Sequence, residues 1–212
     1  MQLRLFSTLI VSAFAVMALN SARADDGPWE VRLRAAYLDP ANNSNSVDDL
    51  VPANAVHINE KWMPDLNFEY FFTPNWSAEL VLTYPVTMHV TVGGTPIGTF
   101  KLLPPTLTGK YNFLPNSNFQ PYVGAGVNFS IMSDQSLAVP GVSALKINST
   151  AVGYALQTGF DYKIRDHWYA NMDVKWMALG TDVYLPGQIR ISTLHINPWL
   201  FGIGIGYRFG GH

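Results

Sequence analysis

Residues 66–72, Leu66-Asn67-Phe68-Glu69-Tyr70-Phe71-Phe72, decide the fold class because apolar and polar side chains alternate along most of the segment. Leu66, Phe68 and Tyr70 fall on one face, while Asn67 and Glu69 fall on the other. This alternation has the two-residue period of a β-strand, not the 3.6-residue period of a helix. The segment is therefore predicted to be a strand with one apolar and one polar face.

Alternation of the same kind recurs along the chain, so eight strands are predicted. They are residues 29–38, 56–72, 76–92, 98–113, 119–132, 148–162, 168–179 and 195–209. Three connections are short and rich in turn residues: 73–75, 114–118 and 163–167. Four others are longer or end in irregular strand tips, near 39–54, 93–95, 133–147 and 180–194. Short turns at one end, long loops at the other and an even strand number predict an all-β fold, an eight-stranded antiparallel transmembrane β-barrel of the outer membrane.

The first 24 residues are predicted to be a signal peptide for Sec-type export. Arg4 supplies a positive charge, residues 5–19 form an apolar run, and Ala22-Arg23-Ala24 is a small-x-small cleavage motif. A spanning helix is the alternative, but the apolar run is short for a bilayer. Residues 25–212 are then the barrel domain, located in the outer membrane of a Gram-negative cell.

The composition narrows the classes of function. The formal net charge is −2 and no block of like charge occurs, so no nucleic-acid partner is expected. The chain has no cysteine, so disulfides do not stabilise it after export. No later apolar run is long enough for a spanning helix. A membrane protein whose apolar residues alternate along strands fits these observations.

Aromatic residues gather at the strand ends beside the short turns. They are Phe72, Trp76, Phe113, Phe119, Tyr162, Trp168 and Phe209. Amphipathic rings at this height are typical of the girdle that a barrel places at the membrane interface. A soluble sandwich or a lipocalin-like barrel is the alternative, but it would turn this apolar face inward.

The opposite face of the strands is charged near the short turns. Its predicted lumen floor, or gate, consists of Arg32, Arg34, Glu69, Glu79, Lys110, Asp173, Lys175 and Arg208, joined by Glu30, Asp65 and Asp161. An eight-stranded barrel is just wide enough for side chains to fill, so these charges are expected to pair and to close the axis. The plainer interpretation is a polar core with no further role.

Toward the long loops, the same face becomes apolar. The residues expected to line a ligand-binding upper lumen are Met63, Val81, Phe100, Leu102, Met132, Met177, Leu179, Ile196 and Leu200. An apolar pocket with few polar groups is the usual form of a site for a small apolar ligand. The alternatives are that these residues only fill the upper core, or that the inward parity slips at a bulge.

Pro104 and Pro105 interrupt the predicted fourth strand. Proline donates no ladder hydrogen bond, and a closed barrel offers no free edge where it would be tolerated. We expect the pair either to mark a lateral exit from the upper lumen or to form an ordinary bulge.

Several motifs together resemble the OmpW family of small outer-membrane barrels. They are Leu-Pro-Pro-Thr-Leu at 103–107, Gln-Pro-Tyr-Val-Gly-Ala-Gly-Val-Asn at 120–128, Asn-Pro-Trp at 197–199 and Gly-Tyr-Arg-Phe at 206–209. The resemblance implies an eight-stranded barrel with a hydrophobic lumen that takes up small hydrophobic molecules, and an AlkL-like branch of the family assists alkane uptake. It also implies closure of the lumen by inward residues on the third and seventh strands, here Val81 and Lys175. An aromatic residue is more usual at the second position, and residues 210–212 extend beyond the usual terminal aromatic residue.

Catalysis, metals and cofactors are not expected. The five histidines, His57, His89, His167, His195 and His212, show no metal-binding spacing. Gly202, Gly204 and Gly206 alternate on one strand, which indicates a thin lumen wall and not a nucleotide-binding loop.

Two functions of different class remain open on sequence. The first is an outer-membrane channel or transporter for passive passage of small hydrophobic molecules. The second is a structural or surface-interaction barrel with an inert core, whose loops bind partners. The expected partners are outer-membrane lipid, small hydrophobic ligands and, during biogenesis, the barrel-assembly machinery, with the protein a monomer.

Overall fold

The computed structural model describes residues 26–44, 55–138, 144–185 and 189–210. The predicted signal peptide and residues 211–212 of the C-terminal extension lie outside this range. Within the described ranges, no helix has the length and apolar character needed to cross a membrane.

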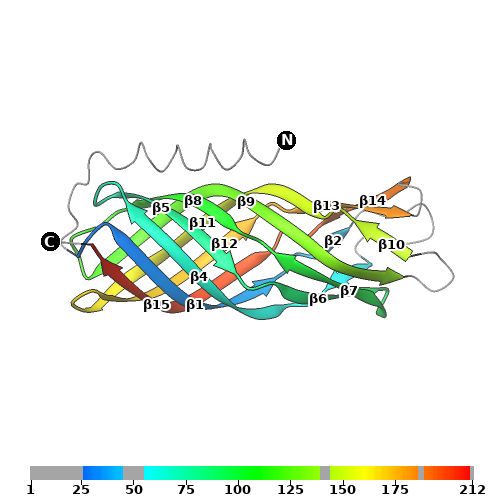
Figure 1. Ribbon diagram of the computed structural model, residues 1–212, viewed down its shortest axis with the longest axis horizontal. Coiled ribbons are helices and arrows are strands. Elements are labelled where there is room, and N and C mark those ends of the chain that lie inside the picture. Colours follow the sequence, from blue (N-terminus) through cyan, green and yellow to red (C-terminus); the bar gives the residue numbers. More distant parts are fainter. Residues whose placement is uncertain (1–25, 45–54, 139–143, 186–188, 211–212) are drawn as a thin grey trace.

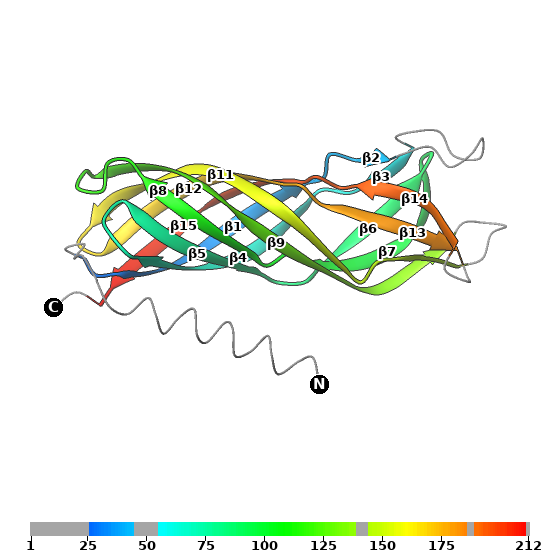
Figure 2. The same cartoon turned by 90° about the horizontal axis from the view of Figure 1, so that it is seen from above.

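Eight antiparallel strands close into an elongated barrel, which confirms the predicted fold class (Figures 1 and 2). In order around the barrel they are β1 (Trp29–Asp39), β4 (Lys61–Phe71), β5 (Trp76–Thr83), β8 (Thr106–Asn112), β9 (Phe119–Ala138), β11 (Thr150–Arg165), β12 (Trp168–Met177) and β15 (Trp199–Phe209). Strand β15 returns to β1 with Trp29 opposite Phe209 and Asp39 opposite Trp199. This closure leaves the described part of the eight-stranded wall without an unpaired edge.

Within the described ranges, seven shorter strands continue the sheet beyond one end of the barrel. They are β2 (Asn43–Ser44), β3 (Val56–Ile58), β6 (Val86–Val92), β7 (Thr95–Leu103), β10 (Ala144–Ile147), β13 (Gly180–Leu185) and β14 (Ile189–His195). Figure 1 shows β2, β10, β13 and β14 gathered at the right. We call this the loop end, and we call the opposite end, with the three short connections, the turn end.

The connections at the loop end correct part of the prediction. Strand β9 runs on to Ala138, and residues 180–194 include the paired strands β13 and β14. The connection at 93–95 is a tight turn, because Gly93 and Gly94 have φ of 57° and 82°. Two successive residues with positive φ match the twist of a hairpin, and glycine adopts this backbone at little cost. Pairing within hairpins therefore forms strands at the loop end even where apolar and polar residues do not alternate clearly.

Two aromatic girdles bracket the outward apolar surface. At the turn end, the predicted set is partly or largely exposed, including Trp76 at 56% and Phe113 at 50%. A second girdle, not predicted, lies toward the loop end. Its members are Tyr37, Trp62, Tyr84, Tyr154, Trp176 and Trp199. Within it, the ring centroids of Tyr37 and Trp62 are 5.2 Å apart. Aromatic girdles sit at the membrane interfaces, so the lipid-facing band lies between these two levels.

Glycines on β15 make room for charged side chains inside the barrel. A Cβ added to Gly206 would lie 2.5 Å from Glu30 Oε1 and 3.0 Å from Arg32 Cγ. A Cβ added to Gly202 would lie 3.1 Å from Asp173 Oδ1 and 3.2 Å from Arg34 Nε. This part of the wall is therefore thin because long charged side chains pack directly against the backbone.

We expect Gly206→Ala to destabilise the barrel by about 1–3 kcal/mol, because the new methyl group overpacks a buried ion pair. Gly109→Ala is the matched control, since the nearest atom to its added Cβ is 3.9 Å away. The control is expected to be neutral or slightly stabilising. The stability of the two variants would be compared by urea titration in detergent, with the folded fraction read from the faster-migrating band of unheated samples on a gel. Equal stability of the two variants would contradict the packing argument.

Candidate functional site

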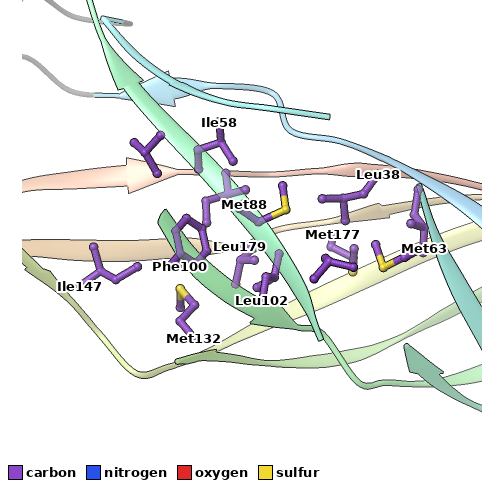
Figure 3. Packing of buried hydrophobic residues seen from close by; sticks show 14 of the residues in the cluster. Leu38, Ile58, Met63, Met88, Phe100, Leu102, Met132, Ile147, Met177 and Leu179 are labelled. Atoms are coloured by element: carbon purple, nitrogen blue, oxygen red, sulfur yellow. The ribbon is translucent and has the colours of Figure 1, made fainter. Parts of the chain in front are cut away.

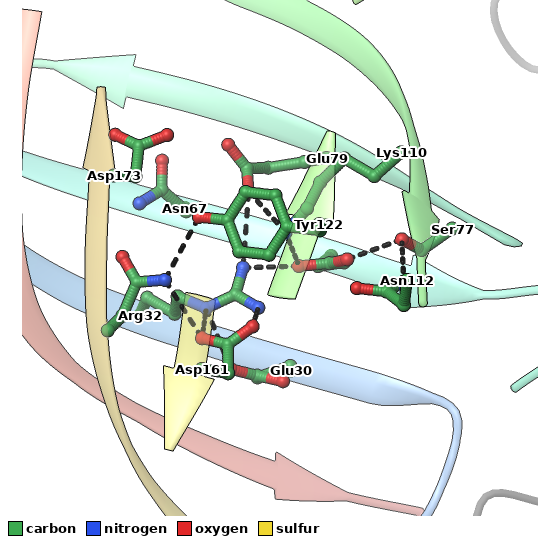
Figure 4. A network of polar contacts seen from close by, with 12 residues as sticks. Glu30, Arg32, Asn67, Ser77, Glu79, Lys110, Asn112, Tyr122, Asp161 and Asp173 are labelled. Carbon is green, nitrogen blue, oxygen red and sulfur yellow. Dashed lines mark hydrogen bonds and ion pairs between the residues drawn. The ribbon is translucent and has the colours of Figure 1, made fainter. Parts of the chain in front are cut away.

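A dense ion-pair cluster fills the lumen at the turn end and is centred on Arg32 (Figure 4). Arg32 Nε lies 2.7 Å from Glu30 Oε1, and Nη2 lies 2.8 Å from Asp161 Oδ2. Its Nη1 contacts a carboxylate oxygen of Glu69 and lies 3.2 Å from Glu79 Oε2. One guanidinium thus pairs with four carboxylates, all of them buried.

The remaining cations extend this cluster around the barrel. Lys110 Nζ lies 2.7 Å from Glu69 Oε2 and 3.1 Å from Glu79 Oε2. Lys175 Nζ lies 3.4 Å from the other oxygen of Glu79. Arg34 pairs with Asp65 at 2.8 Å and with Asp173 at 3.0 Å, while Arg208 pairs with Glu30 at 2.7 Å. The eight residues predicted for the floor therefore lie together inside the barrel, with Glu30, Asp65 and Asp161.

Two tyrosines complete the floor, and the sequence analysis missed both. The ring of Tyr122 is buried, with Lys110 Nζ 3.7 Å from its centroid. Its hydroxyl accepts a hydrogen bond of 3.1 Å from Asn171 Nδ2. Tyr169 lies nearer the turn end, 4.3 Å from the guanidinium carbon of Arg208. Tyr122 shares the inward parity of Gln120 on β9, so extending the parity analysis to uncharged residues would have found it.

Asp26 caps the floor at the turn end. Lys163 and Tyr169 both donate hydrogen bonds to its carboxylate, and His167 Nδ1 lies 3.7 Å away. Burial alone would raise the pKa of Asp26, but the two hydrogen bonds and the positive charge of Lys163 hold it below its ordinary value. The segment before β1 is thereby tied to β11 and β12.

Three carboxylates of the floor converge as metal ligands do. Oxygens of Glu30, Glu69 and Asp161 lie within 4.8 Å of one another. The guanidinium of Arg32 already pairs with all three. The three carboxylates therefore already share one cation of the protein, while Lys110 also pairs with Glu69 and Arg208 with Glu30.

An apolar cluster fills the lumen above the floor, and we call it the chamber (Figure 3). Eight of the nine residues predicted for the upper lumen belong to it. They are Met63, Phe100, Leu102, Met132, Met177, Leu179, Ile196 and Leu200, all no more than 3% exposed. The ninth, Val81, faces the lumen but lies outside this cluster, in register with Asn67 and Thr106.

The chamber also includes residues that the sequence analysis missed. Val86, Met88 and Val90 face inward, although continuing the parity of Val81 along the chain assigns them to the outside. The alternation slips between Thr83, which is buried, and Val86. Tyr84 and Pro85 between them leave the β-ladder. A one-residue slip of this kind exchanges the two faces of a strand.

Pro104 and Pro105 separate β7 from β8 and interrupt one neighbouring ladder. On the β5–β6 side, pairing stops at Val81–Thr106 and resumes at Val86–Leu102. On the β9 side, Phe129 N–H donates to Pro105 O at 2.9 Å.

The side chain of Asn128 strengthens the β9 side of this segment. Its Nδ2 donates to the carbonyls of Pro104 and Pro105, both at 3.2 Å. It also donates to Thr106 Oγ1 at 2.8 Å. The proline segment is thus held to β9 and is detached from the β5–β6 side.

The barrel has a charged floor and an apolar chamber in its lumen, and its sequence was compared with those of known protein families. The sequence model of the OmpW family matches residues 25–209. This chain belongs to the OmpW family. An uncharacterised outer-membrane protein, y4mB, of Sinorhizobium fredii is 38% identical over 91% of this chain and 84% of its own length. Outer membrane protein W of Vibrio cholerae is 33% identical, covering 94% of this chain and 98% of its own.

A solved structure agrees with the family assignment. The crystal structure of the outer membrane protein OprG from Pseudomonas aeruginosa superposes with a TM-score of 0.74 at 31% identity. It covers 89% of this chain and 98% of that one. The predicted resemblance and the location in the Gram-negative outer membrane are confirmed.

This OmpW-family barrel should depend on Arg32 for folding. Arg32→Met leaves the converging carboxylates without their shared cation, and breaking a buried ion pair costs about 3–5 kcal/mol. Arg165→Met is the control, because the Arg165 side chain is 83% exposed and its ion pair is with Asp166, which is itself exposed. We expect refolding into detergent micelles to fail or weaken for Arg32→Met alone. Wild-type urea stability of that variant would contradict the role of Arg32 as the centre of the floor.

Proposed function

We propose that this protein is a passive conduit for small hydrophobic molecules across the outer membrane. The observation that carries the proposal is the chamber of 18 buried apolar side chains above a floor of paired charges. An apolar lining favours ligands that leave water, and the packed, ion-paired floor opposes flow of water and ions along the axis. The turn end is assigned to the periplasm and the loop end to the exterior.

Methionines allow the packed chamber to admit a ligand. Met63, Met88, Met132 and Met177 all lie in the cluster, and their sulfur atoms are seen among its side chains in Figure 3. Methionine has three flexible torsions and repacks more readily than branched side chains do. A ligand can thus displace side chains without breaking backbone pairing.

The gap beside Pro104 supports a lateral exit. The interrupted ladder lies next to Leu102 of the chamber, and Tyr84 of the loop-end girdle lies in the facing segment. A ligand leaving there would enter the outer leaflet near its interface. Because the axial route is filled by charges, a sideways route is the shorter way into an apolar phase.

A surface-interaction barrel is the second candidate function. The observation that favours it is the extension of the sheet past the loop-end girdle, where β13 and β14 pair with each other and β10 joins β13. These hairpins offer backbone and side chains to a partner outside the cell. Loss of hydrophobic uptake on altering the chamber would distinguish the conduit from this alternative.

The remaining assignments are also proposals. We propose that the chain acts as a monomer without catalysing a reaction, that residues 1–24 are removed after export, and that the barrel-assembly machinery inserts it. Closure of the eight-stranded wall by one chain supports the monomer, because β15 pairs with β1 and the described part of that wall has no free edge for a second copy. Membership of the AlkL-like branch stays a prediction.

Placing a charge in the chamber should block transport. We expect Leu102→Arg and Met177→Arg each to reduce uptake of a hydrophobic tracer by about tenfold or more, because an apolar ligand would have to strip water from an unpaired buried charge. Leu102→Met and Met177→Leu keep size and apolar character and serve as controls. Tracer uptake would be measured in cells with equal amounts of folded barrel. Normal uptake through both charged variants would refute the conduit.

Restoring a backbone donor at Pro104 should close the exit. Pro105 O accepts from Phe129 N–H of β9, so the alternation of an antiparallel strand places the backbone nitrogen of Pro104 on the β5–β6 side. The carbonyl of Pro104 already accepts from Asn128 and Thr106. We therefore expect Pro104→Val to raise the melting temperature of the barrel and to lower uptake of the hydrophobic tracer. Pro105→Val is expected to lower this uptake less than Pro104→Val does. Higher stability with unchanged uptake in Pro104→Val would mean that the gap is only a bulge.

A further inference from the structure

The chamber meets the floor in two adjacent rows of lumen-facing residues. The row on the floor side joins Lys110, Gly124, Gln157 and Lys175 across four strands. The row on the chamber side joins Thr108, Gly126, Ala155 and Met177 across the same strands. We call the four residues Thr108, Gly124, Gly126 and Gln157 the shelf.

Both polar side chains of the shelf are buried without a hydrogen-bond partner among the described residues. Gln157 is 5% exposed, and neither its Nε2 nor its Oε1 is hydrogen-bonded. Thr108 is 1% exposed, and its hydroxyl is likewise unpaired. Leaving a buried polar group unpaired costs about 1–3 kcal/mol, and most such groups in proteins have partners. Nearby Asn128 and Tyr122, by contrast, are bonded.

Glycine leaves the wall bare between these two polar groups. A Cβ on Gly124 would lie 2.8 Å from Gln157 Cγ and 3.1 Å from its Nε2. The amide therefore lies over the exposed backbone of Gly124, a position that any larger residue would obstruct. Thr108 stands in the next row, across Gly126 from Ala155. The shelf thus combines two wall residues that lack side chains with a hydroxyl and an amide that can each donate and accept.

We infer that the shelf binds the polar end of a ligand whose apolar body occupies the chamber. The ligand class is a hydrophobic compound with one neutral hydroxyl or carbonyl group. This inference rests on the proposed function, because it requires that ligands enter the chamber. A ligand hydroxyl could donate to Gln157 Oε1 and accept from its Nε2 or from Thr108, so the unpaired groups gain partners.

The charge balance of the floor favours a neutral group over a carboxylate. Among the residues that the structure describes, the buried charged side chains are five cations and six carboxylates. The cations nearest the shelf, Lys110 and Lys175, already pair with Glu79. A ligand carboxylate would add negative charge to a buried cluster in which carboxylates already outnumber cations, and such a charge is costly to bury.

Naphthalene, 1-naphthol and 1-naphthoate test this inference, since they share one apolar body. Equilibrium dialysis would compare their binding to the protein in lipid nanodiscs with binding to empty nanodiscs of the same lipid. After that subtraction, wild type is expected to bind 1-naphthol about tenfold more tightly than naphthalene, as one or two neutral hydrogen bonds allow. Binding of 1-naphthoate is expected to be the weakest of the three.

Substitutions in the shelf should remove the preference and leave the chamber intact. Gln157→Leu and Thr108→Val keep approximate size, and both should lower 1-naphthol binding toward the naphthalene level without weakening naphthalene binding. Thr87→Val makes the same chemical change on the outer face and should alter neither. Both shelf variants should also raise the melting temperature of the ligand-free barrel, because each removes an unpaired buried group.

Three outcomes would overturn the inference. Equal wild-type binding of naphthalene and 1-naphthol would mean that the shelf gives no preference. Retention of the preference in both shelf variants would place the polar contact elsewhere. Lower ligand-free stability of Gln157→Leu and Thr108→Val would show that water already satisfies these groups. In each of these cases, binding of naphthalene would still support the conduit. If neither naphthalene nor 1-naphthol binds, both proposals are overturned.

Discussion

The narrow bore of an eight-stranded barrel is the constraint on which the rest of this structure depends. The interior has space for side chains but not for a solvated channel, so charges turned inward must pair with side chains of opposite sign. Arg32 satisfies much of this requirement by pairing with four carboxylates. Gly202 and Gly206 of β15 follow from the same constraint, since charged side chains of the floor occupy the space that their Cβ atoms would need. The closed floor, the thin wall and the buried aromatic rings thus all follow from the narrow diameter of the barrel.

The position of the chamber relative to the membrane gives the lumen its asymmetry. Leu38 and Met63 of the chamber are chain neighbours of Tyr37 and Trp62, which belong to the loop-end girdle. The chamber therefore begins near the membrane interface and continues toward the loop end, while the charged floor lies at the depth of the lipid band. An apolar compound held at this height is close to the outer leaflet and distant from the turn end.

The sequence predicted most of this arrangement because strand periodicity depends only on local residue order. Alternation placed the floor residues, from Arg32 to Arg208, on one face without any knowledge of strand pairing. It failed where a local irregularity changes the parity, as between Thr83 and Val86, and so Met88 was missed. It also could not predict the hairpins at the loop end, because their order comes from pairing between distant segments. The unpaired state of Gln157 was equally inaccessible, since it depends on side-chain geometry across several strands.

Both proline breaks lie on one side of the barrel, and this position bears on how a ligand could leave. Strand β1 pairs with β15 and with β4 along unbroken registers that extend from Trp29 to Asp39 and from Trp29 to Leu38. The opposite wall contains the breaks at Tyr84–Pro85 and Pro104–Pro105, and the register shifts where β7 pairs with β9. A continuous ladder resists opening because several hydrogen bonds must break together, whereas an interrupted one can part locally. Asn128 confines this freedom further by holding the proline segment to β9. Any lateral movement is thus directed toward the β5–β6 side, where the chamber, the gap and the girdle meet.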